Sequence, residues 1–229
     1  MTNISASLIK DYIVCPRKAY YRLFFSGEVS TNKHIVVGNI VHHALENFWD
    51  SKKACIEYAN QKIKESTIKL DTDKIFNSFD NFFEIFYPLL TPEDQIEYYF
   101  KYKYSDVNIV GKIDRIKKGG IIFDWKTSLS KPDVEKDIQF ILYYLSYEKV
   151  FGKVPNSVIY AQLPTGIMYQ FKPNKEYIDE FKYNILPHVV NTIRTSVLNL
   201  PRNGLFLYDK TTCRDCLYKD VCYEELYYG

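Results

Sequence analysis

A predicted hairpin in the middle of the chain constrains the fold more than any other feature. Two strand-like runs, Val107–Ile116 and Ile121–Trp125, flank Lys118-Gly119-Gly120. Glycines in so short a connection are typical of a tight hairpin loop. If the loop consists of those three residues, the register places Asp114 directly opposite Asp124.

Two carboxylates that face each other across a hairpin suggest a cation between them, because like charges in opposite positions cost stability. Lys126 lies two residues after Asp124, so the alternation of a strand places both on one face. The set offers oxygen ligands for Mg²⁺ or Mn²⁺ beside an ammonium group. On this stretch alone, a solvated hairpin with paired surface charges explains the residues equally well.

Length and composition predict a globular, cytoplasmic protein. The chain has 229 residues, of which 46% are hydrophobic and 25% are charged. It contains no apolar run of membrane-spanning length, and its start does not resemble a signal peptide. The net charge of +2 gives no overall basic field, so any DNA-binding surface must be local. The phosphate-binding loop of ATP-driven motors is absent from the sequence.

A helix that Gly38 is expected to open, running to about Lys52, carries the next candidate ligand. His42 and Glu46 lie one helical turn apart on a shared face, beside an apolar stripe. A lone helical histidine is more often a surface or packed residue than a ligand. The pattern alone therefore leaves both interpretations open for His42.

The remaining elements alternate between strands and helices. Residues 53–90 predict a helical insertion, in which Cys55 is expected to be a plain buried thiol. Gln139 and Tyr143 lie four residues apart, on one face of a predicted helix. The other expected elements are a strand at Gln95–Tyr104, that helix at Asp133–Phe151, a hairpin of Asn156–Leu163 with Ile167–Lys172, and a helix at Lys175–Leu198, whose His188 is expected to be structural.

The N-terminal segment predicts a helix that starts at Ser5 and ends at Cys15-Pro16. A short basic and aromatic cluster of Arg17, Lys18 and Tyr21 follows. Arginine and lysine suit phosphate, and tyrosine suits base stacking, so these residues are candidates for DNA contact. An ordinary solvated helix face with two packed tyrosines explains them as well.

Three of the five cysteines crowd near the C-terminus with metal-ligand spacing. Cys213, Cys216 and Cys222 supply three thiolates, and Cys15 is the candidate for a fourth. An odd number of cysteines without an export signal fits a disulfide framework poorly. Four cysteines suit zinc and an iron–sulfur cluster alike, and unliganded thiols are the third possibility.

Taken in order along the chain, these motifs resemble the PD-(D/E)XK nuclease superfamily, and within it the RecB-like nucleases with an iron–sulfur cluster, such as the CRISPR-associated Cas-four type. The resemblance implies an α/β (α+β) fold with a restriction-endonuclease-like core, in which helices flank a mixed central sheet. It implies a single nuclease domain over residues 1–229 with a helical insertion at 53–90. Residues 1–22 and 205–229 would form an iron–sulfur subdomain that clips the termini together.

The same resemblance assigns roles to the candidate residues. It implies that His42, Asp114, Asp124 and the Trp125 carbonyl hold Mg²⁺ or Mn²⁺ beside a catalytic Lys126. Gln139 and Tyr143 would position the substrate strand. The resemblance also favours a [4Fe–4S] cluster over zinc at the four cysteines, Cys15, Cys213, Cys216 and Cys222.

These assignments predict a metal-dependent DNA exonuclease that prefers single-stranded or frayed ends, with 5′ to 3′ polarity implied by the family. One alternative is a catalytically quiet protein that binds DNA ends as a scaffold for CRISPR adaptation or recombination. Another is a ribonuclease or a structure-specific endonuclease, because one fold supports many specificities. Partners implied are DNA and a CRISPR integrase or recombination or replication proteins; the sequence leaves the pathway and the oligomeric state open.

Overall fold

The computed structural model describes residues 2–27, 32–197, 213 and 216–228. The chain divides into two compact units, and both ends of the chain belong to the same one. Unit 1 contains residues 1–31, 101–111 and 174–229, and unit 2 contains residues 32–100 and 112–173. Of the expected iron–sulfur subdomain, residues 1, 205–212, 214–215 and 229 lie outside the described residues, and the single nuclease domain stays a prediction.

The strands form a mixed sheet, as predicted. Among the described residues it has six strands, in the order β1-β3-β4-β5-β6 with β2 paired to β3. β1 runs parallel to β3 and β4 runs parallel to β5, whereas the β3–β4 and β5–β6 pairs are antiparallel. The strands are β1 (Thr2–Ser5), β2 (Gln95–Tyr104), β3 (Val107–Lys117), β4 (Ile121–Lys126), β5 (Ser157–Gln162) and β6 (Ile167–Phe171).

The predicted register of the central hairpin is confirmed. In the β3–β4 pair, Arg115 lies opposite Phe123 and Lys117 lies opposite Ile121. The next step of this register places Asp114 opposite Asp124. Gly119 and Gly120 form the turn with φ angles of +94° and +81°, in the left-handed region that favours glycine.

The helix that follows β4 connects two parallel strands, as parallel pairing requires. This helix, α6 (Ile138–Phe151), begins five positions later than its predicted start at Asp133. The reason is local, because Asp137 caps the helix by accepting a hydrogen bond from the backbone N–H of Gln139 at 2.8 Å. Gly152 ends the helix in a left-handed conformation.

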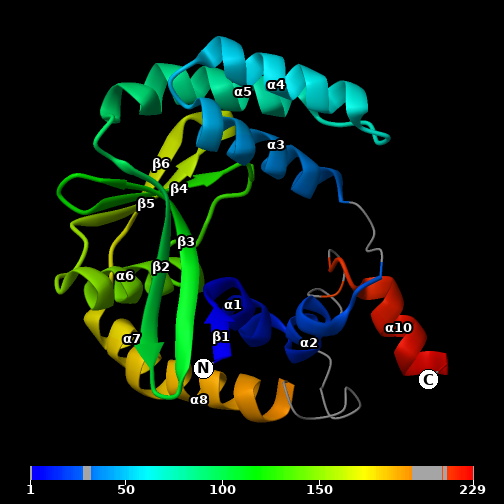
Figure 1. Ribbon diagram of the computed structural model, residues 1–229, viewed down its shortest axis with the longest axis vertical. Coiled ribbons are helices and arrows are strands. Elements are labelled where there is room, and N and C mark those ends of the chain that lie inside the picture. The colour runs from blue at the N-terminus through cyan, green and yellow to red at the C-terminus, as the bar shows by residue number, and fades with distance from the viewer. Residues whose placement is uncertain (1, 28–31, 198–212, 214–215, 229) are drawn as a thin grey trace. The chain divides into compact units, whose positions relative to one another are not determined.

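The helical insertion is confirmed, and it packs against the helix that carries His42 (Figure 1). Val41 and Leu45 of that helix share a buried core with Phe79 and Trp125. Cys55 is a buried thiol whose burial raises its pKa to about 12. The elements are α3 (Lys33–Phe48), α4 (Lys52–Glu65), α5 (Thr72–Asn81), the π-helix η1 (Phe82–Phe86) and the 3₁₀ helix η2 (Tyr87–Leu89).

Both predicted bounds of the His42 helix are wrong. Asn32 caps α3 by accepting from the His34 backbone N–H at 2.8 Å, so the helix starts at Lys33 and Gly38 lies inside it. It ends at Phe48 because Ser51 caps the following helix. A Cβ atom at Gly38 would lie 3.4 Å from the Thr127 hydroxyl, so glycine permits a close approach there.

Unit 1 contains the first two helices and the C-terminal helices. Ser5 caps α1, accepting from the Leu8 N–H at 3.1 Å, and Cys15 is an extended residue before Pro16, as predicted. The long C-terminal helix is confirmed as far as residue 197, with two π-helical stretches, and His188 on it is exposed. The elements are α1 (Ala6–Val14), α2 (Pro16–Phe24), α7 (Lys175–Glu180), η4 (Phe181–Ile185), α8 (Leu186–Thr192), η5 (Ile193–Val197) and α10 (Lys219–Tyr228). No helix within the described ranges is long and apolar enough to cross a membrane.

Candidate active site

Four predicted site residues meet in unit 2, although they come from three elements. His42 lies on α3, Asp114 on β3, and Asp124 and Lys126 on β4. The Nδ1 atom of His42 is 3.7 Å from Oδ2 of Asp114, and Nζ of Lys126 is 2.7 Å from Oδ2 of Asp124. The fold therefore brings His42 of α3 next to the β3–β4 hairpin, although the two are far apart in the sequence.

Of the two carboxylates, that of Asp124 is buried and that of Asp114 is largely buried, and the two repel each other. The Asp124 side chain is 1% exposed and that of Asp114 is 13% exposed. Burial and the charge of Asp124 raise the pKa of Asp114 well above its ordinary value. Although Oδ2 of Asp124 lies at ion-pair distance from Lys126, it has no hydrogen-bond partner of acceptable geometry. A buried acid pair with one such oxygen would be stabilised by a further cation.

Beside the two acids, the site contains a charged lysine, Lys126, and a neutral histidine, His42. Burial alone would lower the pKa of Lys126, but Asp124 and Asp114 raise it above its ordinary value, so the ammonium stays charged. Burial and the charge of Lys126 lower the pKa of His42. The neutral imidazole that results is the form that binds metals. The backbone of Trp125 and the charge of Asp124 oppose this lowering of the His42 pKa.

Gln139 and Tyr143 project from α6 onto the same carboxylate. The Gln139 Nε2 donates to Oδ1 of Asp124 at 3.1 Å, and the Tyr143 hydroxyl donates to that oxygen at 3.2 Å. The Gln139 Oε1 accepts from Nζ of Lys126 at 3.1 Å, so one amide bridges the acid and the lysine. Burial and the Asp124 charge raise the pKa of Tyr143 well above its ordinary value, which keeps its hydroxyl a donor.

An acidic and basic cluster beside the site was not predicted. Lys112 Nζ lies 2.5 Å from Oε2 of Glu97 and 3.3 Å from Oε1 of Glu46. Strand alternation could have found Lys112, because it lies two residues before Asp114 on the same face. No pattern signals Glu97, because its φ of +49° breaks the alternation of β2. Its charge nevertheless acts to raise the pKa of both His42 and Asp114.

The three candidate DNA-contact residues lie in unit 1 and make internal contacts. Arg17 and Tyr21 are 5% and 2% exposed, and Nη2 of Arg17 donates to the Tyr21 hydroxyl at 3.1 Å. The Tyr21 hydroxyl donates in turn to Glu225 of α10. Lys18 pairs with Asp11 at 2.7 Å. These contacts do not favour direct DNA binding by Arg17 or Tyr21, which instead tie α2 to the C-terminal helix.

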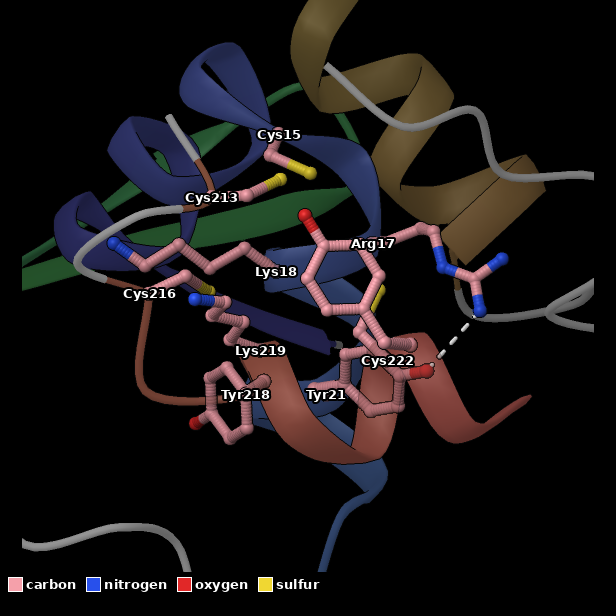
Figure 2. A pocket seen from close by; sticks show the side chains of 10 residues that line it. Cys15, Arg17, Lys18, Tyr21, Cys213, Cys216, Tyr218, Lys219 and Cys222 are labelled. Atoms are coloured by element: carbon pink, nitrogen blue, oxygen red, sulfur yellow. Dashed lines mark hydrogen bonds between the residues drawn. The ribbon is translucent and has the colours of Figure 1, made fainter. Parts of the chain in front are cut away.

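The four candidate ligand cysteines line one small cavity of unit 1, with a volume of about 20 Å³. Figure 2 shows the sulfur atoms of Cys15 and Cys213 pointing toward one another. Arg17, Lys18 and Lys219 line the same cavity, so cationic side chains surround the thiols. Burial raises the pKa of Cys216 and of Cys222 above the ordinary value of a thiol.

The acid site of unit 2 and the cysteine cavity of unit 1 both offer donor atoms that suit metals, although their present arrangement does not form a complete metal site. Within the described part of the chain, no three His, Cys, Asp or Glu side chains are arranged to hold a metal ion. The unit 2 site nevertheless presents an imidazole and two repelling carboxylates, which are ligands of the kind that Mg²⁺ and Mn²⁺ take. The cysteine cavity has room for about one water-sized sphere. The four thiols of this cavity are soft ligands, which suit zinc and an iron–sulfur cluster alike.

Comparison with known proteins identifies the fold and the family. A solved structure named "Putative exonuclease", from Eubacterium rectale, is similar with a TM-score of 0.57 at 18% identity, over 99% of this chain and 93% of that one. The structure of SSO0001 gives a TM-score of 0.40 at 14% identity, over 92% of this chain and 94% of that one. No curated protein matches the sequence. The family model of the PD-(D/E)XK nuclease superfamily matches residues 3–223, so the chain belongs to that superfamily.

Proposed function

We propose that this protein is a metal-dependent deoxyribonuclease that hydrolyses phosphodiester bonds at single-stranded or frayed DNA ends. The observation that carries the proposal is the pair of Asp114, which is largely buried, and Asp124, which is buried, with Lys126 beside them, in a member of a nuclease superfamily. An ammonium held next to two buried carboxylates has little structural value, because the desolvation of three charges is costly. It suits a site where a phosphate and a cation bind.

In this proposal His42, Asp114, Asp124 and the Trp125 carbonyl hold the divalent ion. When bound, Mg²⁺ or Mn²⁺ would neutralise charge on the phosphate and lower the pKa of a coordinated water. The residues of the chain prepare this site before the ion arrives. The neutral His42 ring offers a nitrogen lone pair, and the backbone N–H of Trp125 orients Asp114 by donating to its Oδ2 at 2.7 Å.

Lys126 is placed to stabilise the charge that develops on the phosphate. Preorganised charges in a partly buried site lower a barrier because they need no reorganisation during the reaction. Gln139 contacts both Asp124 and Lys126, and Tyr143 donates to the same Asp124 oxygen as Gln139, Oδ1. These contacts support a role in orienting the catalytic groups, in addition to the predicted contact with the substrate strand.

The first test uses end-labelled DNA with Mg²⁺ or Mn²⁺. We expect the wild type to shorten linear single strands progressively, with slower loss of blunt duplex and none of closed circular DNA. Lys126→Ala should reduce the rate by about a hundredfold or more, because it removes a preorganised charge. The products, resolved by length from a label at either end, report both the mode of cleavage and its polarity.

Three outcomes would contradict the proposal. Cleavage of circles would indicate an endonuclease, and cleavage of RNA alone would indicate a ribonuclease. Tight binding without turnover, unchanged by Lys126→Ala, would support a scaffold that grips DNA ends. The 5′ to 3′ polarity and partners such as a CRISPR integrase or recombination or replication proteins stay predictions from the resemblance, and the cytoplasmic location stays a prediction from the sequence.

The cysteine cavity supports a second part of the proposal, a structural metal group bound by Cys15, Cys213, Cys216 and Cys222. Three of these cysteines follow the nuclease core in the chain and one precedes it, which is the layout of the iron–sulfur RecB-like nucleases. The cationic lining would balance the charge of four thiolates. The resemblance favours a [4Fe–4S] cluster, and zinc is the alternative because four cysteines suit both.

Metal analysis of protein purified without oxygen distinguishes the two groups. A cluster gives a brown protein with iron and acid-labile sulfide, whereas zinc gives a colourless one. With either metal, Cys222→Ala should lower the metal content and the melting temperature. Cys55→Ala is the matched control, because this buried thiol lies in unit 2. Full metal content in the Cys222→Ala protein would show that Cys222 is not a ligand.

A further inference from the structure

A connecting segment lies between the catalytic residues of β4 and those of α6, and a residue on another strand anchors this segment. Residues 127–137 connect the end of β4, with Lys126, to the start of α6, with Gln139. The turn at Ser128–Ser130 is partly exposed, and Leu129 at its tip is 60% exposed. An exposed turn next to catalytic groups needs an anchor if those groups are to keep their positions.

Gln162, at the end of β5, supplies that anchor. Its side-chain Nε2 donates to the carbonyl oxygen of Ser128 at 2.7 Å and to that of Ser130 at 3.0 Å. Its Oε1 accepts from the Thr165 hydroxyl at 2.7 Å, which fixes the orientation of the amide. Gln162 is 2% exposed, so both N–H donors of a buried amide are used on this turn.

The position of Gln162 relates the anchor directly to the catalytic lysine. In the register of β4 and β5, Gln162 is the partner of Lys126, and Tyr160 is the partner of Asp124. The anchored turn therefore begins immediately after Lys126, beside the strand end that carries it. A shift of this turn would move the start of α6 relative to β4, and so would separate Gln139 from Lys126.

We propose that Gln162 is a positioning residue for the nuclease reaction, which holds the turn at 128–130 so that Lys126 and Gln139 keep their contact. The proposal rests on the proposed nuclease function. Among the described residues, the Gln162 side chain forms hydrogen bonds with Ser128, Ser130 and Thr165 and with neither acid of the site. Its effect is expected on the chemical step, because a displacement of about 1 Å can cost about a hundredfold in rate.

Two substitutions separate this role from a purely structural one. Gln162→Met keeps the volume and removes both donors, while the freed carbonyls of the exposed turn can bind water. We expect kcat to fall by about 10- to 100-fold with little change in KM. Gln162→Glu has the same shape but can donate only when its carboxyl is protonated. Its kcat relative to the wild type should therefore rise as the pH falls.

Gln170→Met is the matched control, because Gln170 is an exposed glutamine on the neighbouring strand β6. It should leave kcat, KM and the pH profile unchanged. Hydrogen–deuterium exchange of the peptide over residues 127–137 provides a readout that does not depend on activity. Exchange there should be faster in Gln162→Met than in the wild type, and unchanged in Gln170→Met.

The outcomes distinguish the two hypotheses. A wild type that cleaves no nucleic acid contradicts the nuclease function, while faster exchange in Gln162→Met would still establish the anchor. Unchanged kcat in a folded Gln162→Met protein overturns the positioning role. A loss of activity that only follows the loss of folded protein, measured by circular dichroism, also overturns it. The positioning role is also overturned if the kcat of Gln162→Glu, relative to that of the wild type, does not change with pH.

Discussion

Asp114→Asn is expected to reduce DNA cleavage by about a thousandfold or more and to raise the melting temperature of the metal-free protein at neutral pH. The loss of activity follows from the loss of an anionic ligand, since a catalytic metal supplies several kcal/mol of transition-state stabilisation. The gain in stability follows from the repulsion between Asp114 and Asp124. Asparagine keeps an oxygen to accept from the Trp125 N–H.

The sign of this stability effect depends on pH. Because the folded pKa of Asp114 is raised, the folded state of the wild type loses stability as the pH rises from the unfolded value, about 3.9, through the folded one. The advantage of Asp114→Asn should thus be largest at neutral pH and vanish near pH 4. Scanning calorimetry in a chelating buffer measures it.

A matched control for this pair of measurements is Asp133→Asn, in the exposed segment before α6. It should change neither cleavage nor the melting temperature. Excess Mn²⁺ should stabilise the wild type more than Asp114→Asn, since binding to the folded state raises apparent stability. A lower melting temperature for Asp114→Asn at neutral pH, or retained cleavage, would contradict the description of the site.

Asp94→Ala is expected to destabilise the fold by about 3–5 kcal/mol, because it leaves a buried guanidinium without its partner. Nε of Arg115 lies 3.2 Å from Oδ2 of Asp94, and the two side chains are 2% and 0% exposed. The guanidinium also lies 4.0 Å from the centre of the Trp49 ring. Burial lowers the pKa of Arg115, and Asp94 opposes that change.

Urea denaturation with the chain in a chelating buffer measures this loss. Glu57→Ala is the control, because Glu57 forms an exposed ion pair with Lys53 on the surface of α4, which contributes little. Since Arg115 is the neighbour of Asp114 in β3, the less stable hairpin should also bind Mn²⁺ more weakly. If the free energy of unfolding fell by less than about 1 kcal/mol, the Asp94–Arg115 pair would behave like an exposed surface ion pair. That result would contradict the description of the pair as buried.

Local sequence chemistry predicted the hairpin that carries the site. The glycines of the turn require left-handed backbone, and the alternation along both strands defines the buried face, so the opposition of Asp114 and Asp124 followed from short-range rules. No short-range rule predicted that His42 lies close to Asp114. This proximity was inferred from a family resemblance, and the fold brings His42 to 3.7 Å from Asp114.

Residues whose role depends on distant partners were not predictable. Gln162 is one polar residue at the end of a strand, and only the parallel pairing of β4 and β5 places it beside the turn after Lys126. Arg17 and Tyr21 were candidates for DNA contact because their side-chain chemistry suits it, with a solvated helix face and packed tyrosines as the alternative. They are buried because α10, about 200 positions away in the chain, supplies Glu225 as a partner. Pattern rules do not extend to such contacts.

The division of the chain into units also has a consequence for biosynthesis. All residues of unit 2 precede residue 174, whereas unit 1 needs the segment from 174 to 229. During translation, unit 2 can therefore fold while unit 1 is still incomplete, since domains generally fold as units in the order of synthesis. Cys15 emerges from the ribosome long before Cys213, so the cysteine cavity can form, and can receive a metal, only at the end of synthesis.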